Sequence, residues 1–187
     1  MSDEGAGGFL GRLVAKLAAA GIPNMVVGSF ASSFHGVPRS SQDLDLVIDP
    51  DRHSLSRLLA DLPASEYYVD AEAALDALRR RSQFNVIDMA TAWKADLIVR
   101  RGRPFSVEEM SRRAEGNLLG ARGFVASPED TVLSKLEWAK QSGGSDLQLR
   151  DASGILQLRA SELDLGYIER WVVELELQDL WSKVRGQ

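Results

Sequence analysis

Two aspartates stand one residue apart inside an apolar stretch, DLDLVI at residues 43–48. In a β-strand, residues i and i+2 point to the same face, so Asp43 and Asp45 project together, opposite a core-facing apolar side. Two like charges side by side cost free energy unless a cation or hydrogen-bond donors compensate them. A divalent cation does this, and oxygen ligands favour Mg²⁺ or Mn²⁺. The alternative is a solvent-facing strand that happens to be acidic.

Three further features suit a phosphate or metal site. Gly28 and Ser29 stand where an apolar run gives way to a helical pattern, and a helix N-terminus with a Ser hydroxyl is a natural phosphate cradle. Asp96 is a lone acid in another apolar strand, KADLIV, where a third carboxylate could complete a two-metal cluster for in-line phosphoryl transfer. Arg39, four residues before Asp43, could neutralise a phosphate.

The composition limits the other chemistries that the chain can carry. It has 187 residues, no cysteine and two histidines, so thiolate and His-rich zinc sites are excluded. No apolar run reaches the ~18 to 20 residues that a membrane span needs, and the acidic N-terminus does not resemble a secretory signal. We therefore expect a cytoplasmic protein with no membrane partner.

The net charge of −5 argues against a dedicated nucleic-acid binder. The charge is unevenly distributed, however, because residues 79–122 carry nine arginines and one lysine against five acids. This basic segment could face phosphates, or it could be a solvated, arginine-rich helix face.

Apolar periodicity and cap residues divide the first two thirds of the chain into alternating helices and strands. The predicted helices cover residues 8–20, 30–36, 51–62, 71–81 and 105–115. The predicted strands cover residues 25–27, 43–48, 84–89, 95–99 and 123–126. The short gap between the strands at 84–89 and 95–99 predicts a hairpin.

The last third of the chain is helical. The sequence SPED at 127–130 combines a Ser N-cap, Pro at the first helical position and an acid at the third. Helices are predicted over 128–141, 146–159 and, as one or two segments, 162–185. The expected fold is α+β, a small mixed sheet flanked by helices and followed by a C-terminal helical bundle. The expected domains are 1–126 and 127–187.

Two charged residues interrupt the apolar faces of these C-terminal helices. Lys135 has Val132 and Ala139 at i−3 and i+4, and Asp151 lies in a stripe with Leu147, Ile155 and Leu158. A half-buried carboxylate is costly unless it is paired. Antiparallel packing across the SGGSD turn would bring Lys135 near Asp151, either as an ion pair that locks two helices or as a lysine aimed at a nucleotide phosphate.

The remaining conspicuous side chains favour structural roles. His35 is expected to be a local cap or helix-end residue rather than a base. The four tryptophans, Trp93, Trp138, Trp171 and Trp181, are expected to pack in the core or between helices.

The spacing of these motifs resembles the signature of the nucleotidyltransferase superfamily that includes polymerase β and the CCA-adding enzymes. The matching stretches are VVGSFASSFHGVPRSSQDLDLVI and KADLIV. The resemblance implies a Gly-Ser turn that holds the triphosphate, here Gly28 and Ser29. It also implies three carboxylates that bind two Mg²⁺ ions, here Asp43, Asp45 and Asp96.

The C-terminal motifs resemble those of AbiEii-type nucleotidyltransferase toxins and minimal nucleotidyltransferases. The resemblance covers roughly residues 20–158 and implies that Lys135 and Asp151 are needed for activity. AbiEii-type proteins often carry a lysine two residues before the strand aspartate, and Lys94 matches that lysine.

The resemblance implies metal-dependent transfer of a nucleoside monophosphate from a nucleoside triphosphate (NTP) to a hydroxyl. The acceptor would be RNA, with tRNA one candidate, or a protein, and the chain would act in a toxin–antitoxin or phage-defence system. The metal would be Mg²⁺ or Mn²⁺, and Asp96 would assist as the base. The alternative is a non-catalytic module of the same fold that binds nucleotide or a toxin–antitoxin partner protein.

Overall fold

The computed structural model describes residues 3–186, which form two compact units. The first unit comprises the chain up to Val27 together with Ser41–Val125, and the second comprises Gly28–Ser40 together with the chain from Ala126 onward. The segment Gly28–Ser40 therefore groups with the C-terminal helices. The sequence placed this segment within residues 1–126, and the division into domains at 126/127 stays a prediction.

Within the described residues, the first unit is built on a seven-stranded mixed sheet in the order β3-β4-β5-β2-β1-β7-β6. Its strands are β1 Asn24–Val26, β2 Asp43–Ile48, β3 Tyr67–Val69, β4 Gln83–Asp88, β5 Lys94–Val99, β6 Ala114–Leu118 and β7 Ala121–Val125. The pairs β2–β5 and β1–β7 are parallel, whereas the other neighbours are antiparallel. The predicted hairpin is present as β4 and β5.

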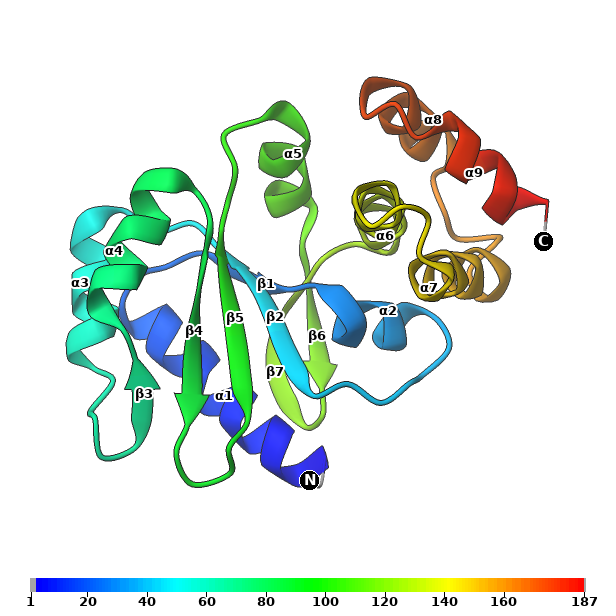
Figure 1. Ribbon diagram of the computed structural model, residues 1–187. Helices are drawn as coiled ribbons and strands as arrows, with labels where there is room; N and C mark the ends of the chain where they lie inside the picture. Colours follow the sequence, from blue (N-terminus) through cyan, green and yellow to red (C-terminus); the bar gives the residue numbers. More distant parts are fainter. Residues whose placement is uncertain (1–2, 187) are drawn as a thin grey trace. The chain divides into compact units, whose positions relative to one another are not determined.

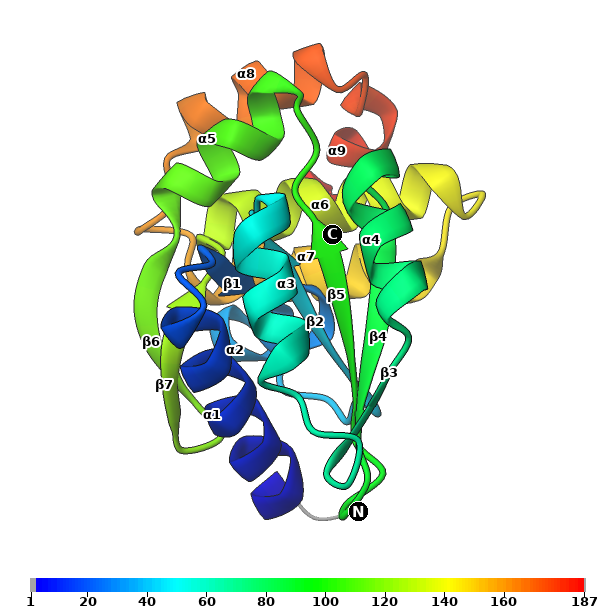
Figure 2. The same ribbon diagram turned by 90° about the vertical axis from the view of Figure 1, so that its left-hand side faces the viewer.

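Three helices of the first unit, α1 Asp3–Ala19, α3 Arg52–Ala60 and α4 Ala71–Arg80, lie on one face of this sheet (Figure 2). The fourth helix, α5 Pro104–Arg112, follows β5. Leu44, Leu46 and Ile48 of β2 are fully buried, as are apolar residues of α1 and α3. Alternation along β2 therefore separates a buried apolar face from a face that carries Asp43 and Asp45.

The second unit is helical (Figure 1). Its helices are α2 Gly28–His35, α6 Pro128–Gln141, α7 Asp146–Leu158, α8 Leu165–Glu174 and α9 Gln178–Arg185. Helices α6 and α7 pack together, and α2 contacts both. The start of α6 confirms its predicted cap, because the Ser127 side chain accepts a hydrogen bond from the Asp130 N–H and Pro128 is the first helical residue.

These observations confirm the predicted α+β class, but two edge strands are missing from the sequence prediction. β3 has only three residues and an exposed Tyr68, and β6 reads AEGNL, which lacks apolar alternation. The helix predicted over 105–115 ends at Arg112, because the chain turns there into β6. Among residues 3–186, no helix has both the length and the hydropathy that a membrane crossing requires.

Candidate functional site

The three predicted metal ligands share one face of the central strand pair. β2 and β5 are parallel neighbours in which Asp45 is aligned with Asp96 and Asp43 with Lys94. All four residues alternate with fully buried apolar residues, so their side chains lie on the face opposite the core. The register of one strand pair thus brings together three carboxylates and one ammonium group.

Lys94 lies between two of these carboxylates. Its Nζ is 3.3 Å from Oδ1 of Asp43 and 3.4 Å from Oδ1 of Asp96. Partial burial acts to lower the pKa of Lys94, but the negative charges of Asp96 and Asp43 outweigh it and raise that pKa above its ordinary value. The side chain is therefore a full cation at neutral pH, held against two of the predicted metal ligands.

The donor set on this face suits a hard divalent cation, because carboxylate oxygens are the ligands that Mg²⁺ and Mn²⁺ prefer. Oδ1 of Asp96 is buried and accepts no hydrogen bond from the described residues, so it has unused capacity as a ligand. Within residues 3–186, however, no three His, Cys, Asp or Glu side chains form a group that could hold a metal ion. The assignment of the three aspartates as metal ligands therefore stays a prediction.

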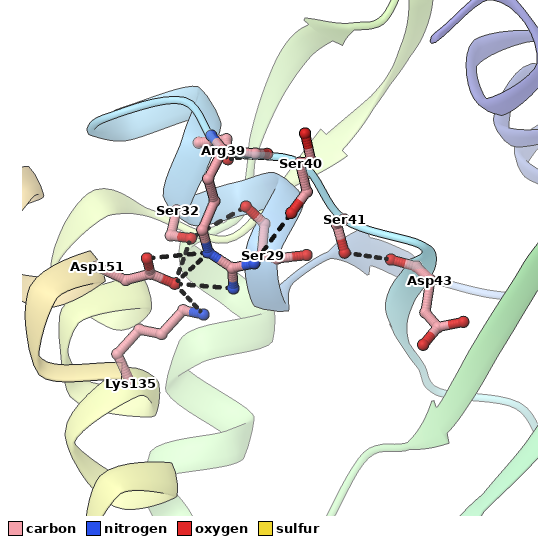
Figure 3. Close-up of polar contacts among 9 residues, drawn as sticks. Ser29, Ser32, Arg39, Ser40, Ser41, Asp43, Lys135 and Asp151 are labelled. Atoms are coloured by element: carbon pink, nitrogen blue, oxygen red, sulfur yellow. Dashed lines mark hydrogen bonds and ion pairs between the residues drawn. The ribbon is translucent and has the colours of Figure 1, made fainter. Parts of the chain in front are cut away.

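A second polar cluster lies within the second unit, centred on Asp151 of α7 (Figure 3). Lys135 of α6 places its Nζ 2.7 Å from Oδ2 of Asp151, so the predicted proximity of these two residues is confirmed. Arg39, in the segment after α2, donates from Nε to Oδ1 at 3.1 Å and from Nη2 to Oδ2 at 3.1 Å. Ser32 of α2 donates its hydroxyl to Oδ2 at 3.2 Å.

This cluster is largely shielded from solvent, with the side chains of Lys135 and Asp151 only 5% and 7% exposed. Burial acts to raise the pKa of Asp151, but hydrogen bonds from Arg39 and Lys135 outweigh it and hold that pKa below its ordinary value. The carboxylate is therefore ionised at neutral pH and accompanied by two cations. The cluster carries a net positive charge and ties together α2, α6, α7 and the segment that contains Arg39.

Gly28 and Ser29 are the first two residues of α2, at the predicted strand-to-helix junction. Gly28 has a φ of 63°, in the left-handed region that a Cβ disfavours, so the turn requires glycine. Ser29 is buried, and its backbone carbonyl accepts a hydrogen bond from the Ser32 hydroxyl. Their predicted contact with phosphate stays a prediction.

The structure thus distributes the predicted site residues over the two units. Asp43, Asp45, Lys94 and Asp96 belong to the first unit, on the β2–β5 face. The second unit contains the others: Gly28, Ser29, Arg39, Lys135 and Asp151.

Two expectations about the second unit are wrong in part. Leu147 and Leu158 are exposed, so the apolar stripe around Asp151 reduces to Ile155, which is fully buried. Asp151 owes its burial to the packing of α7 against α6 and α2. Trp138 is 53% exposed on α6, whereas the other three tryptophans are buried as expected.

His35 closes α2 in a structural role, as the sequence suggested. Its Nε2 lies 2.7 Å from the carbonyl oxygen of Ala126, and the side chain is buried. Burial is the main cause that lowers the pKa of this imidazole below its ordinary value.

Sequence reasoning missed two partners of Asp151. The sequence predicts that Arg39 meets a phosphate, whereas in the structure it contacts a carboxylate, and no sequence motif points to Ser32. They lie 112 and 119 residues from Asp151 along the chain, so no local spacing could reveal either contact. The sequence does show that Asp151 is a charged residue in a helix with a buried side. A buried carboxylate needs charged or hydrogen-bonding partners, but the helix pattern does not identify them.

The fold is similar to that of several solved structures. An antigenic nucleotidyltransferase-like protein from Paracoccidioides brasiliensis superposes with a TM-score of 0.58 at 19% identity, covering 96% of this chain and 91% of that one. The structure of ANT(2'')-Ia in complex with adenylyl-2''-tobramycin gives a TM-score of 0.56 at 12% identity, covering 97% of each chain. The solution structure of the antibiotic-resistance factor ANT(2'')-Ia gives a TM-score of 0.53 at 13% identity, covering 99% of this chain and 94% of that one.

No family model and no curated protein matches the chain. At these low identities the structural likeness establishes the fold, which is nucleotidyltransferase-like. The chemistry must be argued from the residues of this chain.

Proposed function

We propose that this chain is a divalent-metal-dependent nucleotidyltransferase that transfers a nucleoside monophosphate from an NTP to a hydroxyl group, with cleavage of the bond between the α- and β-phosphates and release of pyrophosphate. The observation that carries the proposal is the register of β2 and β5, which aligns Asp45 with Asp96 and places Asp43 on the same face. The nucleotidyltransferase-like fold supports the same activity. Three acids on one sheet face are costly to a protein that only has to fold.

The roles of the carboxylates follow from their chemistry. Asp43, Asp45 and Asp96 would hold Mg²⁺ or Mn²⁺, which when bound lowers the charge of the triphosphate and activates the attacking oxygen. Asp96 serves as the base that accepts the proton of the acceptor hydroxyl. Its Oδ1, which accepts no hydrogen bond from the described residues, suits this role.

The remaining site residues bind the phosphates of the nucleotide. Gly28 and Ser29 offer the N-terminus of α2, where backbone N–H groups and a positive dipole end favour an anion. Arg39, Lys94 and Lys135 supply positive charge. Asp151 positions Lys135 and Arg39 by binding both, which is also what a purely structural ion-pair lock would do.

We propose a hydroxyl of RNA, tRNA included, or of a protein as the acceptor, and an AbiEii-type role in a toxin–antitoxin or phage-defence system. The complex of ANT(2'')-Ia with adenylyl-2''-tobramycin shows that a protein of this fold binds a nucleotidylated small molecule. A small-molecule hydroxyl therefore belongs in the acceptor test.

The second candidate is a module that binds nucleotide or a partner protein without turnover. The bridging position of Lys94 favours it, because an ammonium group already pairs with two of the carboxylates. The net charge of −5 would suit a basic partner protein.

The deciding experiment incubates the wild-type chain with each α-labelled NTP, Mg²⁺ or Mn²⁺, and RNA, protein or tobramycin as the acceptor. Asp43→Ala is the test variant. Asp76→Ala is the matched control, because Asp76 is paired with exposed arginines of its own helix. We expect label transfer by the wild type and the control but not by Asp43→Ala. Nucleotide binding without label transfer to any acceptor would instead support the non-catalytic module.

A further inference from the structure

The ammonium group of Lys94 contacts carboxylate oxygens that a metal ion would also need as ligands. It lies within 3.4 Å of one oxygen of Asp43 and one oxygen of Asp96, both predicted metal ligands. Two other lysines of the first and second units, Lys16 and Lys140, each form an ion pair with a single carboxylate, Asp61 and Glu176 respectively. Lys94 is distinct because it bridges two acids from adjacent strands.

A divalent cation and this ammonium group compete for the same oxygens. Mg²⁺ binds its oxygen ligands at about 2.0–2.1 Å in near-octahedral geometry, which leaves no room for a second cation against the same atoms. Two positive charges so close together also repel each other. Lys94 must therefore leave at least one of its two carboxylates before that carboxylate can coordinate a metal.

The contact of Lys94 with Asp96 is easily exchanged. Nζ of Lys94 lies 3.4 Å from the buried Oδ1 of Asp96, a separation longer than that of a strong charge-assisted hydrogen bond. The lysine side chain is 33% exposed, and its flexible four-carbon stem lets the ammonium group swing to another anion.

We propose that Lys94 is an internal counter-cation, which holds Asp43 and Asp96 until a divalent ion binds and then transfers to a phosphate of the incoming nucleotide. The inference rests on the proposed function and deepens it. It predicts that the metal alone binds weakly, because the ion must displace Lys94. The nucleotide favours the exchange, because its phosphate gives the displaced ammonium group a new partner.

The test measures the affinity of the full-length protein for Mn²⁺ alone, by isothermal titration calorimetry and by the electron paramagnetic resonance signal of unbound Mn²⁺. Lys94→Met removes the charge while keeping an unbranched side chain, and Lys94→Gln is a second neutral variant that can still hydrogen-bond to both acids. Lys94→Arg keeps the charge. Lys16→Met is the matched control, since it removes a lysine that pairs with Asp61. Circular dichroism establishes that each variant is folded.

We expect the two neutral variants to bind Mn²⁺ about tenfold more tightly than the wild type, within the ~5- to 150-fold range typical of coupled sites. Lys94→Arg and Lys16→Met should stay within about threefold of the wild type. In the labelling assay, the neutral variants should show a raised KM for the NTP, because the phosphate loses a cation.

Equal or weaker Mn²⁺ binding by the folded neutral variants would overturn the inference. If the wild type nevertheless transfers label, the proposed nucleotidyltransferase function stands and only the role of Lys94 is overturned. If neither the wild type nor any variant binds Mn²⁺ or transfers label, both the proposed function and the inference are overturned.

Discussion

Asp151 shows what a single buried carboxylate requires of its surroundings. It is the common partner of Lys135, Arg39 and Ser32, and it is the only negative charge among them. Replacing it with asparagine would leave two cations close together, one of them buried. We expect Asp151→Asn to lower the free energy of unfolding by about 3 kcal/mol, measured by urea denaturation at neutral pH. A loss below about 0.5 kcal/mol would show that the cluster contributes little to stability.

The same residue makes stability depend on pH in the acid range. Because the folded state holds the pKa of Asp151 below its ordinary value of 3.8, its stabilising contribution is present above that value and is lost as the pH falls through the folded pKa. Asp151→Asn should therefore be less sensitive than the wild type to acidification below about pH 4. Parallel unfolding curves across this range test the difference.

His35 makes the free energy of unfolding depend on pH in a higher pH range than Asp151 does. Its pKa is lowered in the folded state, mainly by burial, so protonation favours the unfolded chain. Stability should decline as the pH falls below about 6.5, and His35→Gln should flatten that decline. The matched control is His53→Gln, because His53 is exposed on α3, whereas His35 is buried.

At the scale of the element, the start of α6 depends on one hydroxyl. Ser127 Oγ accepts from the Asp130 N–H and donates to the buried Asp130 carboxylate. Ser127→Ala should cost about 1–2 kcal/mol in thermal or urea unfolding. Ser145→Ala at the start of α7 is the control, because Ser145 makes no side-chain cap hydrogen bond. Equal losses in the two variants would contradict the capping role.

The packing of α2 against α7 depends on a close approach at Gly36. A Cβ there would lie 2.9 Å from a side-chain carbon of Ile155 and 3.1 Å from its backbone nitrogen. Gly36→Ala should therefore destabilise the fold by about 1–3 kcal/mol. Gly102→Ala, where a Cβ meets no atom within 4 Å, should have little effect on the unfolding free energy. An unchanged free energy of unfolding in Gly36→Ala would show that α2 and α7 can move apart without loss of stability.

At the scale of the whole molecule, strand alternation and helix caps are local sequence signals. They correctly predict which residues share a strand face and where a helix begins. They place Asp43 and Asp45 on one face of a strand and start α6 at Pro128. Pairing between distant segments has no local signal. The alignment of Lys94 with Asp43 depends on the β2–β5 register, and the contact of Arg39 with Asp151 spans 112 residues.

The grouping of Gly28–Ser40 with the C-terminal helices is a further consequence of non-local packing. The segment follows β1 in the chain, yet α2 contacts α6 and α7. The AbiEii-type role and the identity of the acceptor depend on surfaces that spacing does not describe, and they stay predictions.

The central claim is that the acidic face of β2 and β5 performs metal-dependent nucleotidyl transfer. The most direct test compares initial rates of label transfer from α-labelled NTP by the wild type, Asp96→Asn and the surface control Asp76→Asn, with Mg²⁺ or Mn²⁺. We expect Asp96→Asn to lose at least about 10²-fold in rate, since Asp96 is proposed as both a metal ligand and the base, whereas Asp76→Asn should keep the wild-type rate. Transfer at the wild-type rate by folded Asp96→Asn would contradict it.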